Sequence, residues 1–192
     1  MSAFMAVLRK EGQARRKGGH RPFFVVERAE GGQTVLVGPP NAGKSLLVAR
    51  LTGASPEVAD YPFTTSLPLP GMMAFEDIQL QLVDLPPVAR AGTEFWVFEI
   101  AKAADLVLLV VDVADDDVLT ATDDTIAVLA ERHIDLVSAV SDDDAPGLAR
   151  RTILVANKVD GAGAADNLAM LRELVGDRFP VVPVSAATGD NL

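Results

Sequence analysis

Short apolar runs recur along the chain and alternate with stretches of helical spacing. Several runs are apolar at every position and rich in β-branched residues, which is typical of strands buried on both faces of a sheet. The predicted strands span residues 34–37, 78–83, 106–111, 152–156 and 181–184. The predicted helices between them span residues 44–51, 95–103, 123–131 and 165–174. This alternation predicts a mostly parallel sheet with right-handed crossovers.

One predicted element runs against the parallel pattern. Residues 72–75 and 78–83 are separated only by Glu76 and Asp77, which indicates a hairpin. The expected fold class is therefore α/β, with a mixed, mostly parallel sheet, one antiparallel strand and helices on both faces. In such sheets, ligands bind at the carboxyl ends of the strands.

Basic residues are concentrated at the N-terminus, whereas the rest of the chain is acidic. Residues 1–28 contain seven Lys and Arg against two Asp and Glu, and the remainder contains ten against twenty-five. A basic helix is expected over residues 3–17, ended by Gly18 and Gly19. Such a segment could contact nucleic acid or an anionic surface, and it could equally be a solvated arm. The acidic body would repel phosphate except at a site built by local geometry.

Length and composition favour one soluble unit. The chain has 192 residues, of which 49% are hydrophobic, and this content can fill one substantial core. The absence of cysteine excludes disulfides, cysteine-ligated metal and thiol catalysis. No apolar run approaches the ~20 residues that span a bilayer. We therefore expect a cytoplasmic protein without a membrane partner.

A glycine-rich loop between a predicted strand and a predicted helix is the strongest chemical signal. The motif G-x-x-x-x-G-K-[ST] is matched by Gly38, Pro39, Pro40, Asn41, Ala42, Gly43, Lys44 and Ser45. Its glycines let the loop wrap around phosphate oxygens, so that backbone N–H groups and the helix N-terminus face the anion. We expect Lys44 to contact the β- and γ-phosphates and the Ser45 hydroxyl to ligate Mg²⁺, with Leu46 in the same nucleotide-binding segment. A glycine-rich turn without a ligand is the alternative.

A candidate base-binding motif follows the strand at residues 152–156. It has the form N-K-x-D, with Asn157, Lys158 and Asp160. The Asp160 carboxylate can accept hydrogen bonds from N1–H and the exocyclic amino group of guanine, and adenine offers no such pair of donors. The motif alone is short, but together with the phosphate loop it predicts a guanine nucleotide.

A third segment at this edge follows the strand at residues 181–184. Ser185, Ala186 and Ala187 are placed to present a backbone N–H to guanine O6. A helix N-cap at Ser185 is an alternative that is compatible with this role.

With these motifs the chain resembles the translation-factor-related GTPases, and within them the Obg-like and developmentally regulated GTP-binding protein families. Tyr-Pro-Phe-Thr-Thr at residues 61–65, with Pro70 and Gly71, is similar to their first switch. Residues 81–87 are similar to their second switch. The resemblance covers residues 31–192 and implies a P-loop GTPase fold. Residues 17–24 also resemble the link between a basic helix and the GTPase domain in the developmentally regulated branch.

The resemblance implies further nucleotide and metal contacts. Thr65 would complete the Mg²⁺ shell in the GTP state, with Phe63 and Thr64 beside it in the first switch. Asp84 would hold Mg²⁺ through water, which suits a hard, hydrated cation; a strand-end cap is the alternative role. The predicted catalytic residues are thus Lys44, Thr65 and Asp84, and the predicted metal ligands are Ser45 and Thr65.

The second switch departs from the usual D-x-x-G pattern at two positions. Pro87 replaces the glycine whose N–H senses the γ-phosphate, and proline has no N–H to donate. Val88 stands where Ras-like enzymes have a glutamine that orients the attacking water. Slow intrinsic hydrolysis and weak coupling of this switch to the nucleotide are expected.

Asn41 in the phosphate loop resembles an asparagine that helps some relatives hold K⁺ near the phosphates. A monovalent cation there would supply charge stabilisation that an arginine finger otherwise provides. Turn chemistry is the alternative role, because asparagine tolerates tight loops.

Together these features predict a Mg²⁺-dependent, slow GTP hydrolase, and the resemblance implies a ribosome or RNA partner. The alternatives are a nucleotide-gated binding module that barely hydrolyses GTP, and a phosphate-loop ATPase if residues 157–160 do not reach the base. We expect a basic N-terminal helix and linker over residues 1–30 and a GTP-binding domain over residues 31–192. The domain is expected to lack its last helix and the downstream TGS domain of the developmentally regulated branch.

Overall fold

The structure is a computed structural model that describes residues 26, 29, 31–53, 68–75, 78–140 and 149–192. The expected basic helix and the first-switch residues Phe63, Thr64 and Thr65 lie outside the described residues. Their predicted roles therefore stay predictions.

A mixed sheet organises the described chain. Its strands are β1 (Gln33–Val37), β2 (Leu69–Phe75), β3 (Ile78–Asp84), β4 (Leu106–Asp112), β5 (Asp135–Val137), β6 (Ala149–Asn157) and β7 (Val181–Pro183). Their order is β2-β3-β1-β4-β6-β5, and β7 also pairs with β6. Within the described ranges β2 and β3 form the antiparallel pair and the other pairings are parallel. The predicted hairpin and mixed sheet are confirmed.

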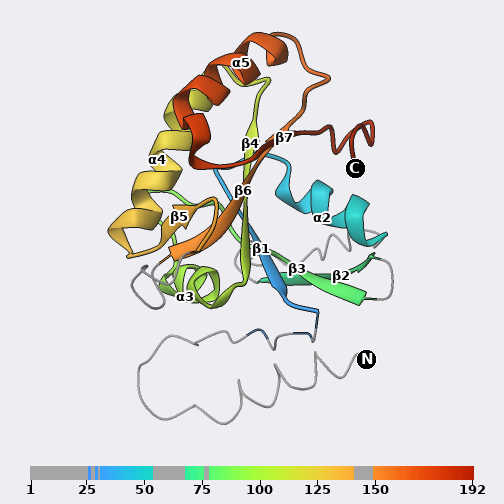
Figure 1. Cartoon of the computed structure of the whole chain (residues 1–192), viewed down its shortest axis with the longest axis vertical. Coiled ribbons are helices and arrows are strands. Elements are labelled where there is room, and N and C mark those ends of the chain that lie inside the picture. The colour runs from blue at the N-terminus through green and yellow to red at the C-terminus, as the bar shows by residue number, and fades with distance from the viewer. Residues whose placement is uncertain (1–25, 27–28, 30, 54–67, 76–77, 141–148) are drawn as a thin grey trace.

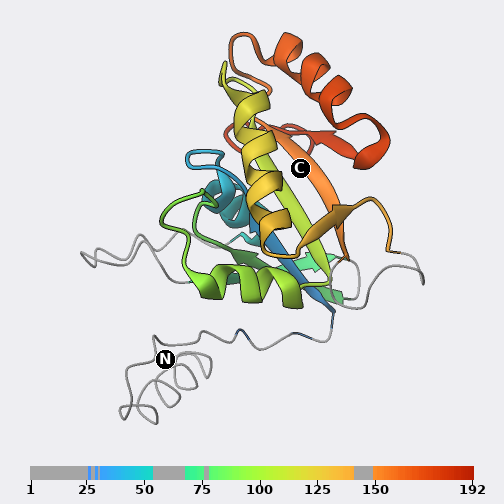
Figure 2. The same ribbon diagram turned by 90° about the vertical axis from the view of Figure 1, so that its left-hand side faces the viewer.

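Helices cover both faces of this sheet, as Figures 1 and 2 show. They are α2 (Lys44–Thr52), α3 (Phe95–Ala103), α4 (Val118–Glu131) and α5 (Ala164–Val175), with a short 3₁₀ helix, η1 (Gly176–Arg178). Val35 and Val37 of β1 belong to the core under α3, α4 and α5, whereas Leu36 belongs to the core under α2. The alternation of strand side chains between two faces thus produces the three layers.

Strands β2 and β6 each begin three residues earlier than predicted, and two other elements differ more from the sequence expectation. Helix α4 begins at Val118 rather than at residue 123, and its first turns contain threonines, which have low helix propensity. Thr122 donates its hydroxyl to the Val118 carbonyl at 2.7 Å and is buried, so packing stabilises a helical start that propensity does not predict. Strand β5 has three residues, too few for a hydrophobic period to be read.

The topology brings the predicted motifs to one edge of the sheet. The loops after β1, β3, β4, β6 and β7 all follow the carboxyl ends of parallel strands. No helix in the described part of the chain has both the length and the apolar character of a bilayer-spanning segment.

Candidate functional site

The loop after β1 has a backbone that only glycine permits at two positions. Gly38 and Gly43 have φ values of 153° and 87°. A Cβ on Gly38 would lie 2.1 Å from the Val110 carbonyl oxygen, and one on Gly43 would lie 2.3 Å from Asn157 Nδ2. Asn41 also has a positive φ, 61°, which asparagine tolerates better than most residues. The two glycines predicted to wrap phosphate are therefore also required by neighbouring strands.

Lys44, the first residue of α2, extends back over this loop. Its Nζ donates to the carbonyl oxygens of Gly38 at 3.3 Å and Pro39 at 2.9 Å. The side chain is buried, and burial lowers the pKa of the ammonium group, partly opposed by the negative charge of Asp84. The amine is thus held where the loop would receive a phosphate anion.

Ser45 and Asp84 meet beside Lys44. The Ser45 hydroxyl donates to Asp84 Oδ2, while Asp84 Oδ1 is buried and has no hydrogen-bond partner in the described chain. Burial raises the pKa of Asp84, opposed by the Ser45 hydrogen bond and the Lys44 charge. A buried polar atom without a partner is unusual in native proteins. A carboxylate oxygen next to a hydroxyl is a donor set that fits Mg²⁺.

The loop after β3 is bonded to the phosphate loop through Val88. The Val88 N–H donates to the Gly38 carbonyl at 3.1 Å, and the Val88 side chain is buried with 3% of its surface exposed. Pro87, which precedes it, is exposed. Pro86 and Pro87 have no N–H, so the next backbone donor in this loop is the N–H of Val88. This donor is already bonded to the Gly38 carbonyl.

Further along, the same loop is bonded internally and to α4. The Thr93 hydroxyl oxygen accepts the Ala89 N–H at 2.8 Å. Arg90 forms exposed ion pairs with Asp124 at 3.2 Å and Glu131 at 2.9 Å. The two Arg90 ion pairs connect this loop to α4.

Asn157 joins two loops of the site. Its Nδ2 donates to the Ala42 carbonyl at 2.8 Å, and its Oδ1 accepts the Ala186 N–H at 2.9 Å. The residue is buried. The N-K-x-D motif predicted Asn157 to be a base-contacting residue. In the structure, both ends of its amide connect the phosphate loop to the loop after β7.

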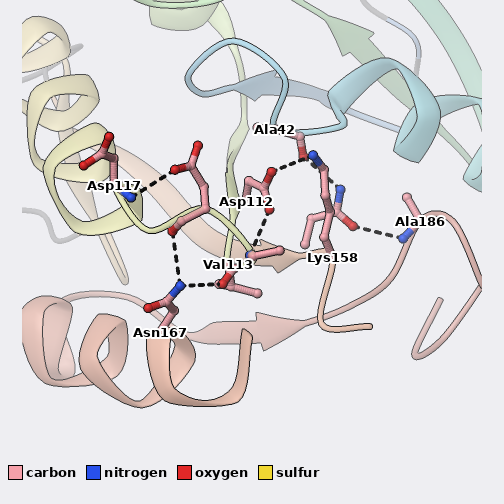
Figure 3. A network of polar contacts seen from close by, with 10 residues as sticks. Ala42, Asp112, Val113, Asp117, Lys158, Asn167 and Ala186 are labelled. Carbon is pink, nitrogen blue, oxygen red and sulfur yellow. Dashed lines mark hydrogen bonds and ion pairs between the residues drawn. The ribbon is translucent and has the colours of Figure 1, made fainter. Parts of the chain in front are cut away.

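The other two residues of the N-K-x-D motif have different surroundings. Lys158, at a positive φ of 67°, forms a 2.5 Å ion pair with Asp112 Oδ2, drawn in Figure 3. Asp112 Oδ1 also accepts the Ala114 N–H at 2.9 Å. Asp160 is exposed and has neither a hydrogen bond nor an ion pair within the described chain. Its carboxylate is available to accept hydrogen bonds from a ligand.

The loop after β7 closes into a compact turn. Ser185 is fully buried, and its hydroxyl oxygen accepts the Thr188 N–H at 3.1 Å. The Ser185 N–H donates to the Asp190 carbonyl at 3.0 Å. The bond from the Thr188 N–H to the Ser185 hydroxyl resembles a helix N-cap. The residues that follow form a turn and not a helix, so Ser185 does not cap a helix.

Three residues that order this edge were not predicted from the sequence. Asp112 pairs with Lys158, and Asn167 of α5 donates to the carbonyl oxygens of Val113 at 3.0 Å and Asp115 at 3.2 Å. Arg50 of α2 contacts the loop after β7. Their partners lie far away in sequence, so no local spacing could mark these residues.

Comparisons with known proteins point to one family. The family described as 50S ribosome-binding GTPase matches residues 33–158. A GTPase Obg of Moorella thermoacetica is 33% identical over 183 residues, which cover 91% of this chain and 40% of that protein. The developmentally-regulated G-protein 1 of Arabidopsis thaliana is 37% identical over 105 residues, covering 52% of this chain and 26% of that protein. The chain thus spans less than half the length of these relatives.

A solved structure shares the fold. Era in complex with MgGDPNP and nucleotides 1506–1542 of 16S ribosomal RNA aligns with a TM-score of 0.61 at 22% identity. The alignment covers 83% of this chain and 52% of that chain.

Proposed function

Since the chain belongs to the 50S ribosome-binding GTPase family, we propose that it binds GTP and GDP with Mg²⁺ and hydrolyses GTP to GDP and phosphate. Residues 31–192 would form the GTP-binding domain. The observation that supports this proposal best is the Ser45–Asp84 pair beside Lys44, with a buried carboxylate oxygen that has no partner in the described chain.

Phosphate binding would rest on the loop and on Lys44. The loop N–H groups and the N-terminus of α2 would face the anion, and Lys44 would exchange its carbonyl partners for phosphate oxygens. Both would stabilise charge on the transferred phosphoryl group. Because Lys44 is buried, this interaction would form in a site screened from water.

The metal would be held by Ser45 as a direct ligand, by Asp84 through water and, in the GTP state, by Thr65. When bound, Mg²⁺ neutralises charge on the β- and γ-phosphates. The unpartnered Asp84 oxygen supports this assignment, because a second hydrogen-bonding group or ion is needed to offset its burial.

Guanine selectivity would come from Asp160 and from the loop after β7. The exposed Asp160 carboxylate would accept from N1–H and the 2-amino group of the base. Asn157 would hold the surrounding loops in register, which its two backbone contacts support.

Hydrolysis would be slow. The buried Val88 side chain leaves that position without a group that could orient water. Asn41 would help a K⁺ ion to supply charge near the phosphates, and its exposed side chain in the loop is compatible with that role.

A second candidate is a nucleotide-gated binding module with little or no hydrolysis. The observation that favours it is the Val88 N–H bonded to the Gly38 carbonyl, which leaves the second switch held by protein rather than by a γ-phosphate. A ribosome or RNA partner is part of either proposal and rests on the family description and on the basic residues 1–28.

Phosphate release from GTP with Mg²⁺, in KCl and in matched NaCl, tests the proposal, with Lys44→Ala as the blank. Turnover above the blank supports the hydrolase, and faster turnover in KCl supports the role of Asn41. Absence of turnover in both salts, with GTP still bound, would favour the binding module. Competition of ATP against GTP separates both from an ATPase.

A further inference from the structure

Arg50 is an exposed residue of α2 whose side chain reaches the loop after β7. Its Nε donates to the Ala186 carbonyl at 3.0 Å, and its Nη2 donates to the Ala187 carbonyl at 2.7 Å. The planar guanidinium thus contacts two successive carbonyls, a geometry that its fixed fork of donors favours. Because α2 begins at Lys44, Arg50 connects the phosphate-binding helix to the loop predicted to meet the base.

The backbone donors of this loop are almost all used. Four of the five N–H groups from residue 185 to residue 189 have an acceptor at 2.9–3.1 Å within the described chain. The acceptors are the carbonyl oxygens of Asp190 and Ser185, the hydroxyl of Ser185 and the side-chain oxygen of Asn157. The Ala187 N–H is the one without an acceptor in the described chain.

The contact with Arg50 sets the direction of this remaining donor. The Ala186 carbonyl and the Ala187 N–H belong to one peptide unit, and the described chain has no cis peptide. In a planar trans unit, the C=O and N–H bonds point in opposite directions. Because Arg50 holds the carbonyl toward α2, the N–H points away from α2. A charged donor on the carbonyl also polarises the unit and strengthens the N–H as a donor.

We propose that Arg50 is a positioning residue for guanine recognition, which holds the Ala187 N–H toward the O6 atom of the base. The inference rests on the proposed function and adds a residue outside the nucleotide-binding motifs. Guanine carries an acceptor, O6, where adenine carries an amino group. A fixed N–H therefore favours guanine over adenine, independently of the contacts made by Asp160.

Equilibrium binding of three nucleoside diphosphates with Mg²⁺ tests this role, because the three bases separate O6 from the 2-amino group. GDP has both groups, IDP has only O6, and 2-aminopurine riboside diphosphate has only the amino group. Arg50→Ala should weaken the binding of GDP and of IDP by a similar factor of about tenfold. Its effect on the 2-aminopurine nucleotide should be negligible. Arg50→Lys can bond one carbonyl and should lose less GDP affinity than Arg50→Ala.

Arg172→Ala is the matched control, because Arg172 is an exposed arginine on α5 with no side-chain partner in the described chain. It should bind all three nucleotides like the wild type. Unchanged GDP binding by Arg50→Ala would overturn the proposed role of Arg50 and would leave the proposed function intact. An equal loss for the 2-aminopurine nucleotide would also overturn it, because the loss would then not depend on O6. If the wild-type chain binds none of the three, the proposed function fails together with this inference.

Discussion

The N–H of Val88 donates to the carbonyl of Gly38 at 3.1 Å, which bonds the loop after β3 to the loop after β1. This contact directs the Val88 side chain into the core, where 3% of its surface is exposed. A buried apolar side chain at this position offers no group that could orient a water molecule. We therefore expect that a glutamine introduced at this position alone would not supply such a group.

Val88→Gln should destabilise the protein without accelerating hydrolysis. A buried amide without partners costs about 1–3 kcal/mol, so urea unfolding without nucleotide should show a loss of this size. Ala89→Gln at the adjacent exposed position is the control and should change stability by about 0.5 kcal/mol or less. Faster phosphate release by Val88→Gln, at wild-type stability, would contradict the burial argument.

Asn157→Ala should affect stability and nucleotide binding together. The substitution leaves the Ala42 carbonyl and the Ala186 N–H without their partner, which costs about 2–4 kcal/mol in total. Loosening of both loops should weaken GDP binding at least about tenfold. Urea unfolding and GDP titration measure the two effects. Gln79→Ala removes an exposed amide of β3 and should leave both quantities near wild type; a similarly small effect of Asn157→Ala would refute the bridging role.

The buried carboxyl of Asp84 should make stability depend on pH. Burial raises its folded-state pKa above the ordinary 3.8. Between the two pKa values the folded protein binds the proton and the unfolded chain does not, so the free energy of unfolding falls as pH rises through this window. Without metal or nucleotide, Asp84→Asn should exceed the wild type in stability at neutral pH by about 1–2 kcal/mol.

This stability difference should shrink as pH falls toward 3.8, because the folded wild-type carboxyl binds its proton at a higher pH than the unfolded chain does. Urea unfolding of both proteins in EDTA across this range measures it. Under Mg²⁺ and GDP the order should reverse, because the variant loses the proposed metal contact. A difference that does not change with pH would mean that the charge on Asp84 is not what costs stability.

The ion pair between Lys158 and Asp112 should contribute less to stability than the hydrogen bond that Asp112 accepts from the Ala114 N–H. Lys158 is 39% exposed, so solvent screens the pair, and a double-mutant cycle should give a coupling of about 1 kcal/mol or less. Asp112→Ala also removes the acceptor of the Ala114 N–H and should cost more than Lys158→Met. Equal losses in nucleotide-free unfolding would show that the Ala114 contact contributes nothing.

Much of the fold was predictable because it depends on local pattern. Continuous apolar runs and the turn at residues 76–77 predicted the mixed sheet, and the structure confirms it. The resemblance to the Obg-like and developmentally regulated families is also confirmed by the family match and the relatives. The start of α4 and the presence of β5 were not predictable, because packing and pairing stabilise segments whose own preference is weak.

The sequence by itself predicted which motifs follow the carboxyl ends of strands, because motif spacing and the alternation of strands and helices are local properties of the chain. Only the tertiary structure decided which partners the side chains bond to and which side chains are buried. It joins Asn157 to two loops, turns the Val88 side chain into the core and brings Arg50 to the loop after β7. Such contacts join residues up to 137 positions apart. They depend on the packing of helices against the sheet, a long-range property that local sequence patterns do not encode.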